Sequence, residues 1–364
     1  MRVLVAAGGS GGHIFPGLSF LDALKLKDPQ AQVLLVLPKR SKNTVVLPEG
    51  CRASYISICP LKKRIDLSSF VASINLLKGI FESIFLLVEF KPDLVVGFGG
   101  IESVPIVFFA WFFRIKTLLH EQNVIPGRAN RLLAKFVDRV AVSFPDSLGS
   151  WKLSPGRFLV TGNPIRRQLA PLNRDQAREF FGLQKDKFTI LVMGGSHGSQ
   201  RINTGALKAF SGLNNKSSFQ VIHLSGPVSQ DSVQNNYKSF SIDAKVFPFF
   251  GPMEYAYSAA DLAIARAGAT TISELVAFSL PAILVPYPYA YRHQEANARV
   301  LSMKGCAFIV KDEELEAPAL RQAVSSCIAN PGVLSSMRSQ FAQFGKNMAA
   351  ELLVKEAQGL VSLQ

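Results

Sequence analysis

Short apolar runs alternate along the chain with longer segments whose apolar residues recur at helical spacing. In the first half, the runs expected to form strands are 2–7, 32–37, 93–96, 117–120, 138–144 and 157–161. In the second half they are 188–193, 220–224, 245–249, 262–266 and 282–285. Strands that alternate with helices are typical of parallel α/β folds. The pattern therefore predicts parallel sheets covered by helices.

One strand–loop–helix device occurs twice. The stretch RVLVAAGGSGGH at 2–13 resembles FTILVMGGSHGS at 188–199, and each passes from an expected strand through glycines into an expected helix. Two copies predict two facing, Rossmann-like domains, each with a doubly wound parallel sheet. Ligands in such folds bind beyond the carboxyl ends of the strands. We expect a first domain at 1–162, joined by the C-terminal helix 344–364, and a second at 163–343.

Composition narrows the class of protein. The 364 residues are 48% hydrophobic, which suits folded domains with sizeable cores. The net charge is +14, of which residues 1–162 carry +9. Such an excess favours an acidic partner, namely anionic lipid, phosphates or nucleic acid, or serves solubility alone. The four cysteines lack metal or redox spacing, which fits a reducing compartment. Neither a signal peptide nor a membrane-spanning run is expected.

A run of glycines follows the first expected strand, from Gly8 to Gly12, with Ser10 inside it and His13 after it. A helix N-terminus offers free N–H groups to a phosphate or a developing anion, and glycine lets a ligand approach the backbone. The run is not a dinucleotide fingerprint, because Ile14 stands where the last glycine belongs, and no P-loop lysine follows. We therefore favour a ligand loop over a bare turn, without a hydride-transfer cofactor.

Three later segments have similar character: GFGGIES at 97–103, GGSHGSQRIN at 194–203 and ARAGATTISE at 265–274. The first could be a simple glycine turn. The Ser196 hydroxyl in the second suits a phosphate, and the third predicts a helix start whose amides face a diphosphate. Glu274 would then bind the paired hydroxyls of a ribose, or only stabilise the helix start.

Histidines and carboxamides gather near these loops. The five histidines, His13, His120, His197, His223 and His293, fall at or beside expected strand-to-loop junctions. A neutral imidazole can act as a general base near pH 7, although a lone histidine at a strand end is usually structural. HEQN at 120–123 and HQEAN at 293–297 add amides that suit sugar hydroxyls or turns. No Asp-x-Asp pair occurs, so no metal clamp is expected.

Two apolar stretches could form a membrane-docking face. Segment 60–90 combines Lys62, Lys63 and Arg64 with a strongly apolar helical pattern, and segment 106–116 is rich in aromatic residues. Basic anchors beside an apolar face are typical of binding to an anionic membrane surface. The alternative is two buried domain helices. We expect most of these residues to be buried and part of the aromatic excess to remain exposed.

Motifs along nearly the whole chain resemble, in order, the MurG family of peptidoglycan glycosyltransferases. They are GGSGGHIFP, GFGGIESVP, HEQN, TGNPIR, GGSHGSQRIN, GATTISE, LPAILVPYP and HQEANA. The resemblance implies a GT-B fold and inverting transfer of N-acetylglucosamine from UDP-N-acetylglucosamine to the C4 hydroxyl of the muramoyl sugar of lipid I, giving lipid II. It also implies a peripheral protein on the cytoplasmic face of the bacterial inner membrane, acting with other cell-wall synthesis proteins. It implies neither a cofactor, nor a metal, nor a nucleic-acid partner.

The resemblance also implies roles for individual residues around the transferred group. His13 is its candidate catalytic base. Ser10, Gly11 and Gly12 would lie close to the transferred sugar, and Asn123 would hold that sugar.

Further residues are implied around the donor. Arg166 and Ser196 would contact the nucleotide, the backbone of Phe250 would read uracil, and Gln294 would bind sugar hydroxyls. The diphosphate and ribose would be held by Ala269, Thr270, Thr271, Ile272, Ser273 and Glu274.

The second glycine loop departs from the family pattern G-x-G-G-Tyr-x-Ser-Gly-Pro. Ile101 replaces the tyrosine, Val104 replaces the last glycine, and Glu102 lies between them. Because the family's loop is expected to face the lipid diphosphate, a carboxylate there is unexpected.

Other functions remain open at this level. A related UDP-sugar transferase could act on another lipid acceptor, and a UDP-N-acetylglucosamine 2-epimerase of similar fold would need no lipid-facing surface. A basic nucleic-acid binder would require a basic stripe with stacking aromatics and leaves the glycine loops unexplained.

Overall fold

The computed structural model describes residues 1–42, 47–58, 67–151, 154–195, 198–289, 292–316 and 318–362, without the side chains of 67–73 and 155. The residues cluster into two compact units, Met1–Arg167 with Met348–Gln364, and Gln168–Asn347. The boundaries expected from the sequence, after residues 162 and 343, lie a few residues before these. Each unit has its own sheet and its own cores.

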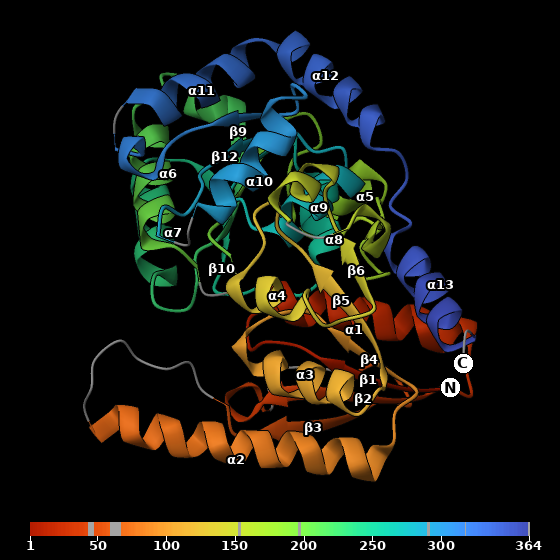
Figure 1. Cartoon of the computed structure of the whole chain (residues 1–364). Coiled ribbons are helices and arrows are strands. Elements are labelled where there is room, and N and C mark those ends of the chain that lie inside the picture. The colour runs from red at the N-terminus through yellow and green to blue at the C-terminus, as the bar shows by residue number, and fades with distance from the viewer. Residues whose placement is uncertain are drawn as a thin grey trace. The chain divides into compact units, whose positions relative to one another are not determined.

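Within its described residues, the first unit is built on a seven-stranded parallel sheet (Figure 1). In spatial order the strands are β3 (Arg52–Ile56), β2 (Gln32–Pro38), β1 (Arg2–Ala6), β4 (Leu94–Gly97), β5 (Lys116–Glu121), β6 (Arg139–Val142) and β7 (Phe158–Val160). The order reverses between β1 and β4. Their carboxyl ends are therefore the topological switch point at which doubly wound sheets bind ligands.

Helices cover both faces of this sheet, so β1 is buried on both sides. Val3 and Val5 join a core formed with α1 (Gly11–Lys27) and α13 (Ala349–Ser362). Leu4 and Ala6 point to the opposite core, formed with α2 (Leu67–Phe90) and α3 (Val104–Phe112). Figure 1 shows α13, in dark blue, beside α1, in red, so the end of the chain returns to the first unit. The remaining helical elements of this unit are α4 (Arg128–Leu133) and the 3-10 turns η1 (Lys39–Ser41), η2 (Ile101–Ser103), η3 (Pro145–Ser150) and η4 (Pro155–Arg157).

The second unit repeats the same plan with a six-stranded parallel sheet over its described residues. In spatial order the strands are β10 (Asp243–Phe247), β9 (Phe219–Leu224), β8 (Phe188–Met193), β11 (Leu262–Ala265), β12 (Ala282–Leu284) and β13 (Ala307–Ile309). The switch point falls between β8 and β11. The helices are α5 (Arg174–Phe180), α6 (Gln200–Ser211), α7 (Gln230–Ser239), α8 (Met253–Ala259), α9 (Ala269–Ala277), α10 (His293–Ser302), α11 (Pro318–Ala329) and α12 (Pro331–Gln340), with the 3-10 turns η5 (Lys216–Ser218), η6 (Asp312–Glu314) and η7 (Phe341–Phe344).

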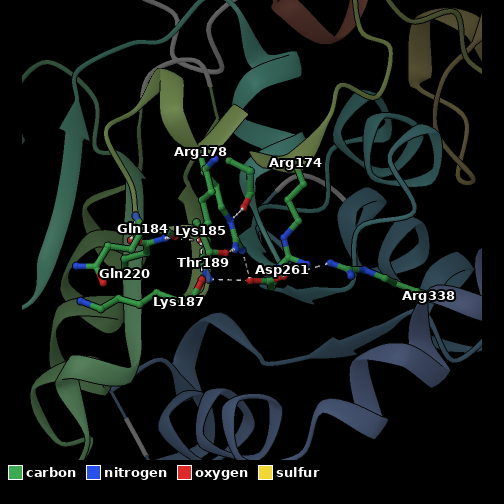
Figure 2. A network of polar contacts seen from close by, with 10 residues as sticks. Arg174, Arg178, Gln184, Lys185, Lys187, Thr189, Gln220, Asp261 and Arg338 are labelled. Carbon is green, nitrogen blue, oxygen red and sulfur yellow. Dashed lines mark hydrogen bonds and ion pairs between the residues drawn. The ribbon is translucent and has the colours of Figure 1, made fainter. Parts of the chain in front are cut away.

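A buried ion-pair network ties the start of the second unit to its sheet (Figure 2). Asp261, just before β11, accepts hydrogen bonds from Arg178 at 2.6 Å and from the backbone N–H of Thr189 at 2.8 Å. Arg174 and Arg338 also pair with this carboxylate. Arg178 is 1% exposed, and burial lowers the pKa of its guanidinium while Asp261 opposes that shift. The network lies at the amino ends of β8 and β11, so it leaves the carboxyl ends to other residues.

The predicted fold class, two doubly wound parallel-sheet domains, is confirmed, and each expected strand is present with small shifts at its ends. Two edge strands were missed. The residues of β3 are mostly half-buried, and β13 has only three residues, so neither gives a strong apolar run. The first helix begins at Gly11, within the glycine run, and Pro16 lies inside it.

Candidate active site

The first and second glycine loops lie against each other at the switch point of the first unit. The amide of Gly8 donates to the carbonyl of Gly99 at 2.9 Å. Gly99 and Gly100 have φ of +86° and +87°, and a Cβ on Gly100 would lie 2.6 Å from Cα of Gly8. Both backbone conformation and close approach therefore require glycine here.

His13 stands in the first turn of α1, next to Gly8. Its Nδ1 lies 3.0 Å from Oγ of Ser10, the residue that precedes the helix. Burial lowers the pKa of His13 below its usual value, and the carboxylates of Glu121 and Glu102 oppose that shift. The imidazole is therefore neutral near pH 7 and can accept a proton.

The unexpected carboxylate of the second loop has a partner. Glu102, on η2, is 3% exposed and forms an ion pair with Arg40, on η1. The Arg40 guanidinium also packs on the first loop, because a Cβ on Gly9 would lie 2.8 Å from its Nε. Glu102 therefore does not present an unpaired negative charge to a ligand.

Glu121 organises the loop that follows β5. Its Oε1 accepts from the backbone N–H of Asn123 at 2.9 Å and from the Asn123 amide at 3.1 Å. Its Oε2 accepts from the N–H of Gly127 at 3.0 Å and from Nδ2 of Asn130 at 2.8 Å. Asn123, which we expect to hold the sugar, is thus oriented by a buried carboxylate that sequence reasoning passed over although it lies inside HEQN.

His120 has a structural environment. Its Nε2 lies 3.0 Å from the carbonyl of Gly162, which can only accept, so Nε2 carries the proton and Nδ1 accepts from Gln122. Burial is the main cause that lowers its pKa to about 4. His120 is therefore a neutral link between the end of β5 and the segment after β7.

Arg166 belongs to the first unit. Its guanidinium lies over the ring of Phe15 on α1, 5.1 Å from the ring centroid. Its expected contact with the nucleotide stays a prediction.

In the second unit, α9 begins at the carboxyl end of β11. Gly268 precedes the helix, and the first hydrogen bond of the helix runs from the N–H of Ile272 to the carbonyl of Gly268 at 2.9 Å. The N–H groups of Ala269, Thr270 and Thr271 come before that bond, so they are the ones that can serve an anion. The Ile272 side chain is fully buried.

The other members of the α9 motif differ in what they can offer a ligand. The Ser273 hydroxyl donates to the carbonyl of Ala269 at 3.0 Å. Oγ1 of Thr270 is buried without a hydrogen-bond partner among the described residues. Glu274 accepts a hydrogen bond of 2.7 Å from the hydroxyl of Tyr257, a residue of α8 that the sequence motifs did not indicate.

Gln294, in the first turn of α10, is held by the backbone. Its Oε1 accepts from the N–H of Ala267 at 3.1 Å and from that of Tyr287 at 2.9 Å. A contact with a sugar would therefore have to come from its Nε2 group.

The other two donor residues implied by the resemblance are Phe250, shortly after β10, and Ser196. Phe250 packs against Phe181 and Phe247, each with a centroid separation of 5.1 Å. Ser196, like His197, lies outside the described residues.

A positive cluster at the same sheet edge was missed by sequence reasoning. Arg266 donates to Asp312 at 2.5 Å and to Oγ of Ser199, at the start of α6, at 2.9 Å. Arg201 pairs with the other oxygen of Asp312 at 2.6 Å. Two guanidinium groups share one carboxylate, so a net positive charge lies beside Ser199 and the start of α9.

His223 is as buried as His120. Its Nε2 donates to Oδ1 of Asn203 at 3.0 Å, because the Asn203 amide nitrogen already donates to the carbonyl of Ser225. Its Nδ1 accepts from the Tyr237 hydroxyl at 2.7 Å, and burial lowers its pKa to about 3. His120 and His223 are thus buried structural residues, unlike His13.

Among the residues that the structure describes, no group of three or more His, Cys, Asp or Glu side chains could hold a metal ion. Over the same ranges, no helix has the length and apolar character needed to cross a membrane.

The two parallel-sheet units and the family models that match them identify a two-domain glycosyltransferase. The model of the Glycosyltransferase family 28 N-terminal domain matches residues 3–142, and that of the Glycosyltransferase family 28 C-terminal domain matches residues 189–353. The chain is 37% identical, over 99% of both chains, to the UDP-N-acetylglucosamine–N-acetylmuramyl-(pentapeptide) pyrophosphoryl-undecaprenol N-acetylglucosamine transferase of Thermodesulfovibrio yellowstonii. The chain therefore belongs to the MurG family.

Solved structures agree with this assignment. The crystal structure of Acinetobacter baumannii MurG is similar to this chain with a TM-score of 0.77 and 28% identity, covering 98% of this chain and 99% of that one. A UDP-GlcNAc 2-epimerase from Neisseria meningitidis has a TM-score of 0.69 at 15% identity and covers 98% of this chain and 99% of its own. At that identity the second similarity shows a shared fold only.

Proposed function

We propose that this chain transfers N-acetylglucosamine from UDP-N-acetylglucosamine to the C4 hydroxyl of the muramoyl sugar of undecaprenyl-diphospho-N-acetylmuramoyl-pentapeptide, with inversion. The observation that carries the proposal is 37% identity over 99% of the chain to a relative named for this transfer. The arrangement of both switch points supports it, since each sheet ends in glycine loops and a helix start suited to anions.

The contacts with the diphosphate and ribose of the donor would come from the second unit. The N–H groups at the start of α9 and the positive cluster of Arg201, Asp312 and Arg266 would stabilise the diphosphate as it leaves. Glu274, oriented by Tyr257, would accept hydrogen bonds from the ribose. Helix dipole and guanidinium groups would thereby do what a metal does in other sugar transferases.

The proton is handled by the first unit. His13 would take the proton of the acceptor hydroxyl as that oxygen attacks the sugar carbon from the face opposite the leaving diphosphate. Ser10 fixes the imidazole through Nδ1, and Asn123 would hold the transferred sugar in the orientation set by Glu121.

We further propose that the first unit docks on the inner-membrane surface at the cytoplasmic face through α2. Ile74, Leu77, Phe81, Phe85 and Val88 recur at spacings of three and four residues and are 49%, 59%, 71%, 66% and 60% exposed. Such spacing places them on one side of the helix.

One carboxylate of α2, that of Glu82, is turned inward instead. Glu82 accepts hydrogen bonds from Lys39 at 2.9 Å and from the Ser57 hydroxyl at 2.9 Å. A helix that turns Phe81 and Phe85 outward suits a lipid interface better than water. The expected basic anchors Lys62, Lys63 and Arg64 lie outside the described residues.

Donor and acceptor dependence test the proposal. Calorimetric titration should show tighter binding of UDP-N-acetylglucosamine than of UDP-glucose, UDP-N-acetylgalactosamine or NAD. UDP release should require a soluble, short-chain lipid I analogue. Epimerisation of UDP-N-acetylglucosamine without an acceptor would instead favour the epimerase alternative, and transfer to another lipid sugar only would favour a related transferase.

A further inference from the structure

The pair of Glu102 and Arg40 joins the two glycine loops of the first unit. Glu102 extends from the second loop and is nearly completely buried, whereas the Arg40 side chain is 46% exposed and packs over Gly9 of the first loop. A buried carboxylate is costly unless it is paired, so its presence in place of a neutral residue needs a reason.

The two oxygens of this carboxylate have different neighbours. Oε1 accepts the hydrogen bond from Nη2 of Arg40. Oε2 faces the glycines: a Cβ on Gly8 would lie 3.1 Å from Oε2 and 2.9 Å from Nδ1 of His13. The carboxylate and the imidazole thus flank the same glycine, and only the absence of a side chain on Gly8 lets them share that space.

The charged groups that face His13 come from several elements. Glu121 lies at the end of β5, Glu102 on η2, and Arg40 on η1 beyond Glu102. Arg166 lies over Phe15, two residues further along α1. Glu121 already accepts four hydrogen bonds from the Asn123 loop, so substituting it would disturb that loop as well as the field at His13. Glu102 and Arg40 can be changed separately from it.

We propose that Glu102 is a positioning residue for the base His13, with its carboxylate aimed by Arg40 so that Oε2 stabilises the imidazolium formed when His13 takes the acceptor proton. This inference rests on the proposed transfer reaction. The proton moves from the acceptor hydroxyl to the imidazole, and Glu102 stays ionised. Arg40 serves two ends: it aims the carboxylate and partly offsets its field.

Substituting Glu102 and substituting Arg40 should shift the pKa of His13 in opposite directions. Burial lowers the pKa of His13, and Glu102 is one of the two carboxylates that oppose this. Glu102→Gln removes a negative charge and leaves Arg40 beside the base, so the pKa of His13 should fall by about 1 unit. Arg40→Gln leaves the carboxylate without its cation, so the pKa should rise by up to about 1 unit. A purely structural role for the ion pair would predict equal effects of the two changes.

The experiment measures that pKa in two ways. The His13 imidazole is titrated by NMR in the full-length protein without substrates, for the parent, Glu102→Gln, Arg40→Gln, the double variant and the exposed control Glu49→Gln. The acid limb of kcat/KM with a soluble acceptor is then recorded, because it reports the free enzyme. We expect opposite shifts in the single variants, a near-parental double variant and an unchanged control, in both measurements.

The outcomes separate this inference from the reaction itself. Shifts of the same sign, or no shift in the titration, overturn the positioning role even when the parent transfers the sugar normally. A titration that moves while the acid limb stays fixed overturns the link between Glu102 and the catalytic base. A parent that binds UDP-N-acetylglucosamine but transfers nothing to lipid I analogues overturns the proposed function, whatever the titration gives.

Discussion

The hydroxyl of Tyr257 donates a hydrogen bond of 2.7 Å to Oε2 of Glu274. Tyr257 lies on α8 and is 2% exposed, so it fixes the carboxylate from inside the second unit. A glutamate that only stabilised the start of α9 would gain little from such a rigid partner. The contact therefore supports a role in which the position of the carboxylate matters, as it does for binding a ribose.

The first prediction concerns donor affinity. Glu274→Ala should weaken UDP-N-acetylglucosamine roughly ten- to a hundred-fold, because a lost hydrogen bond to a charged group costs about 1.5–3 kcal/mol. Tyr257→Phe keeps the carboxylate but removes a hydrogen bond that orients it, so its effect should be smaller and of the same sign. Calorimetry gives the affinities, and thermal unfolding serves as the control. Unchanged donor affinity together with lower stability would assign Glu274 to the helix dipole alone.

The second prediction concerns the base. His13→Ala should lower kcat by about 10²–10⁴ while UDP binding stays nearly intact, because general base catalysis contributes in that range. Stopped assays with a soluble acceptor, together with calorimetric titration of UDP, check both parts. If only KM changed, His13 would be a binding residue and the base would have to be sought elsewhere.

The glycine loops could be located from the sequence because their chemistry is local. Glycines that follow an apolar run and precede a helix indicate a strand-to-helix turn, whatever the rest of the chain does. The partner of Glu102 could not be found in this way. Arg40 is 62 residues away in the chain and lies on a 3-10 turn without a motif of its own, so only the folded structure brings the two together.

The histidines show the same limit. The pattern puts His13, His120 and His223 at strand ends without ranking them. The structure shows that His120 and His223 are fully buried and hydrogen-bonded on both ring nitrogens, whereas His13 is partly exposed beside two carboxylates. Burial is a tertiary property, so the sequence could propose a catalytic histidine but could not separate it from the structural ones.

The third prediction concerns stability against pH. The pKa of His120 is about 4 in the folded protein and about 6.5 in an unfolded chain. Between these values the unfolded state binds more protons than the folded state. The contribution of His120 to the free energy of unfolding is therefore fully present above pH 6.5 and is lost as pH drops toward 4. At pH 5 the loss from this residue is about 2 kcal/mol relative to pH 7.

His120→Gln should therefore make the free energy of unfolding of the first unit depend less on pH. The chain's two tryptophans, Trp111 and Trp151, both belong to that unit, so urea unfolding followed by tryptophan fluorescence reports on it. The variant is expected to be less stable than the parent at pH 7, with the difference narrowing by pH 5. Parallel curves for parent and variant would mean that His120 is protonated in the folded protein or that other groups set the slope.

The last prediction concerns the membrane. Phe81 and Phe85 stand at the centre of the exposed apolar side of α2, so Phe81→Ser with Phe85→Ser should remove most of what inserts into the lipid interface. Each buried phenylalanine is worth about 1.5–3 kcal/mol, so binding to anionic vesicles should fall at least ten-fold at any salt concentration.

Replacing Lys62, Lys63 and Arg64 by Ser should also weaken binding to the vesicles, by about 1 kcal/mol per residue, but that loss should shrink as salt rises. Co-sedimentation with vesicles measures both, and turnover of a soluble acceptor should stay near that of the parent. Parental vesicle binding in both variants would remove α2 and the basic triplet from the docking face, and the positive excess of residues 1–162 would then need another partner.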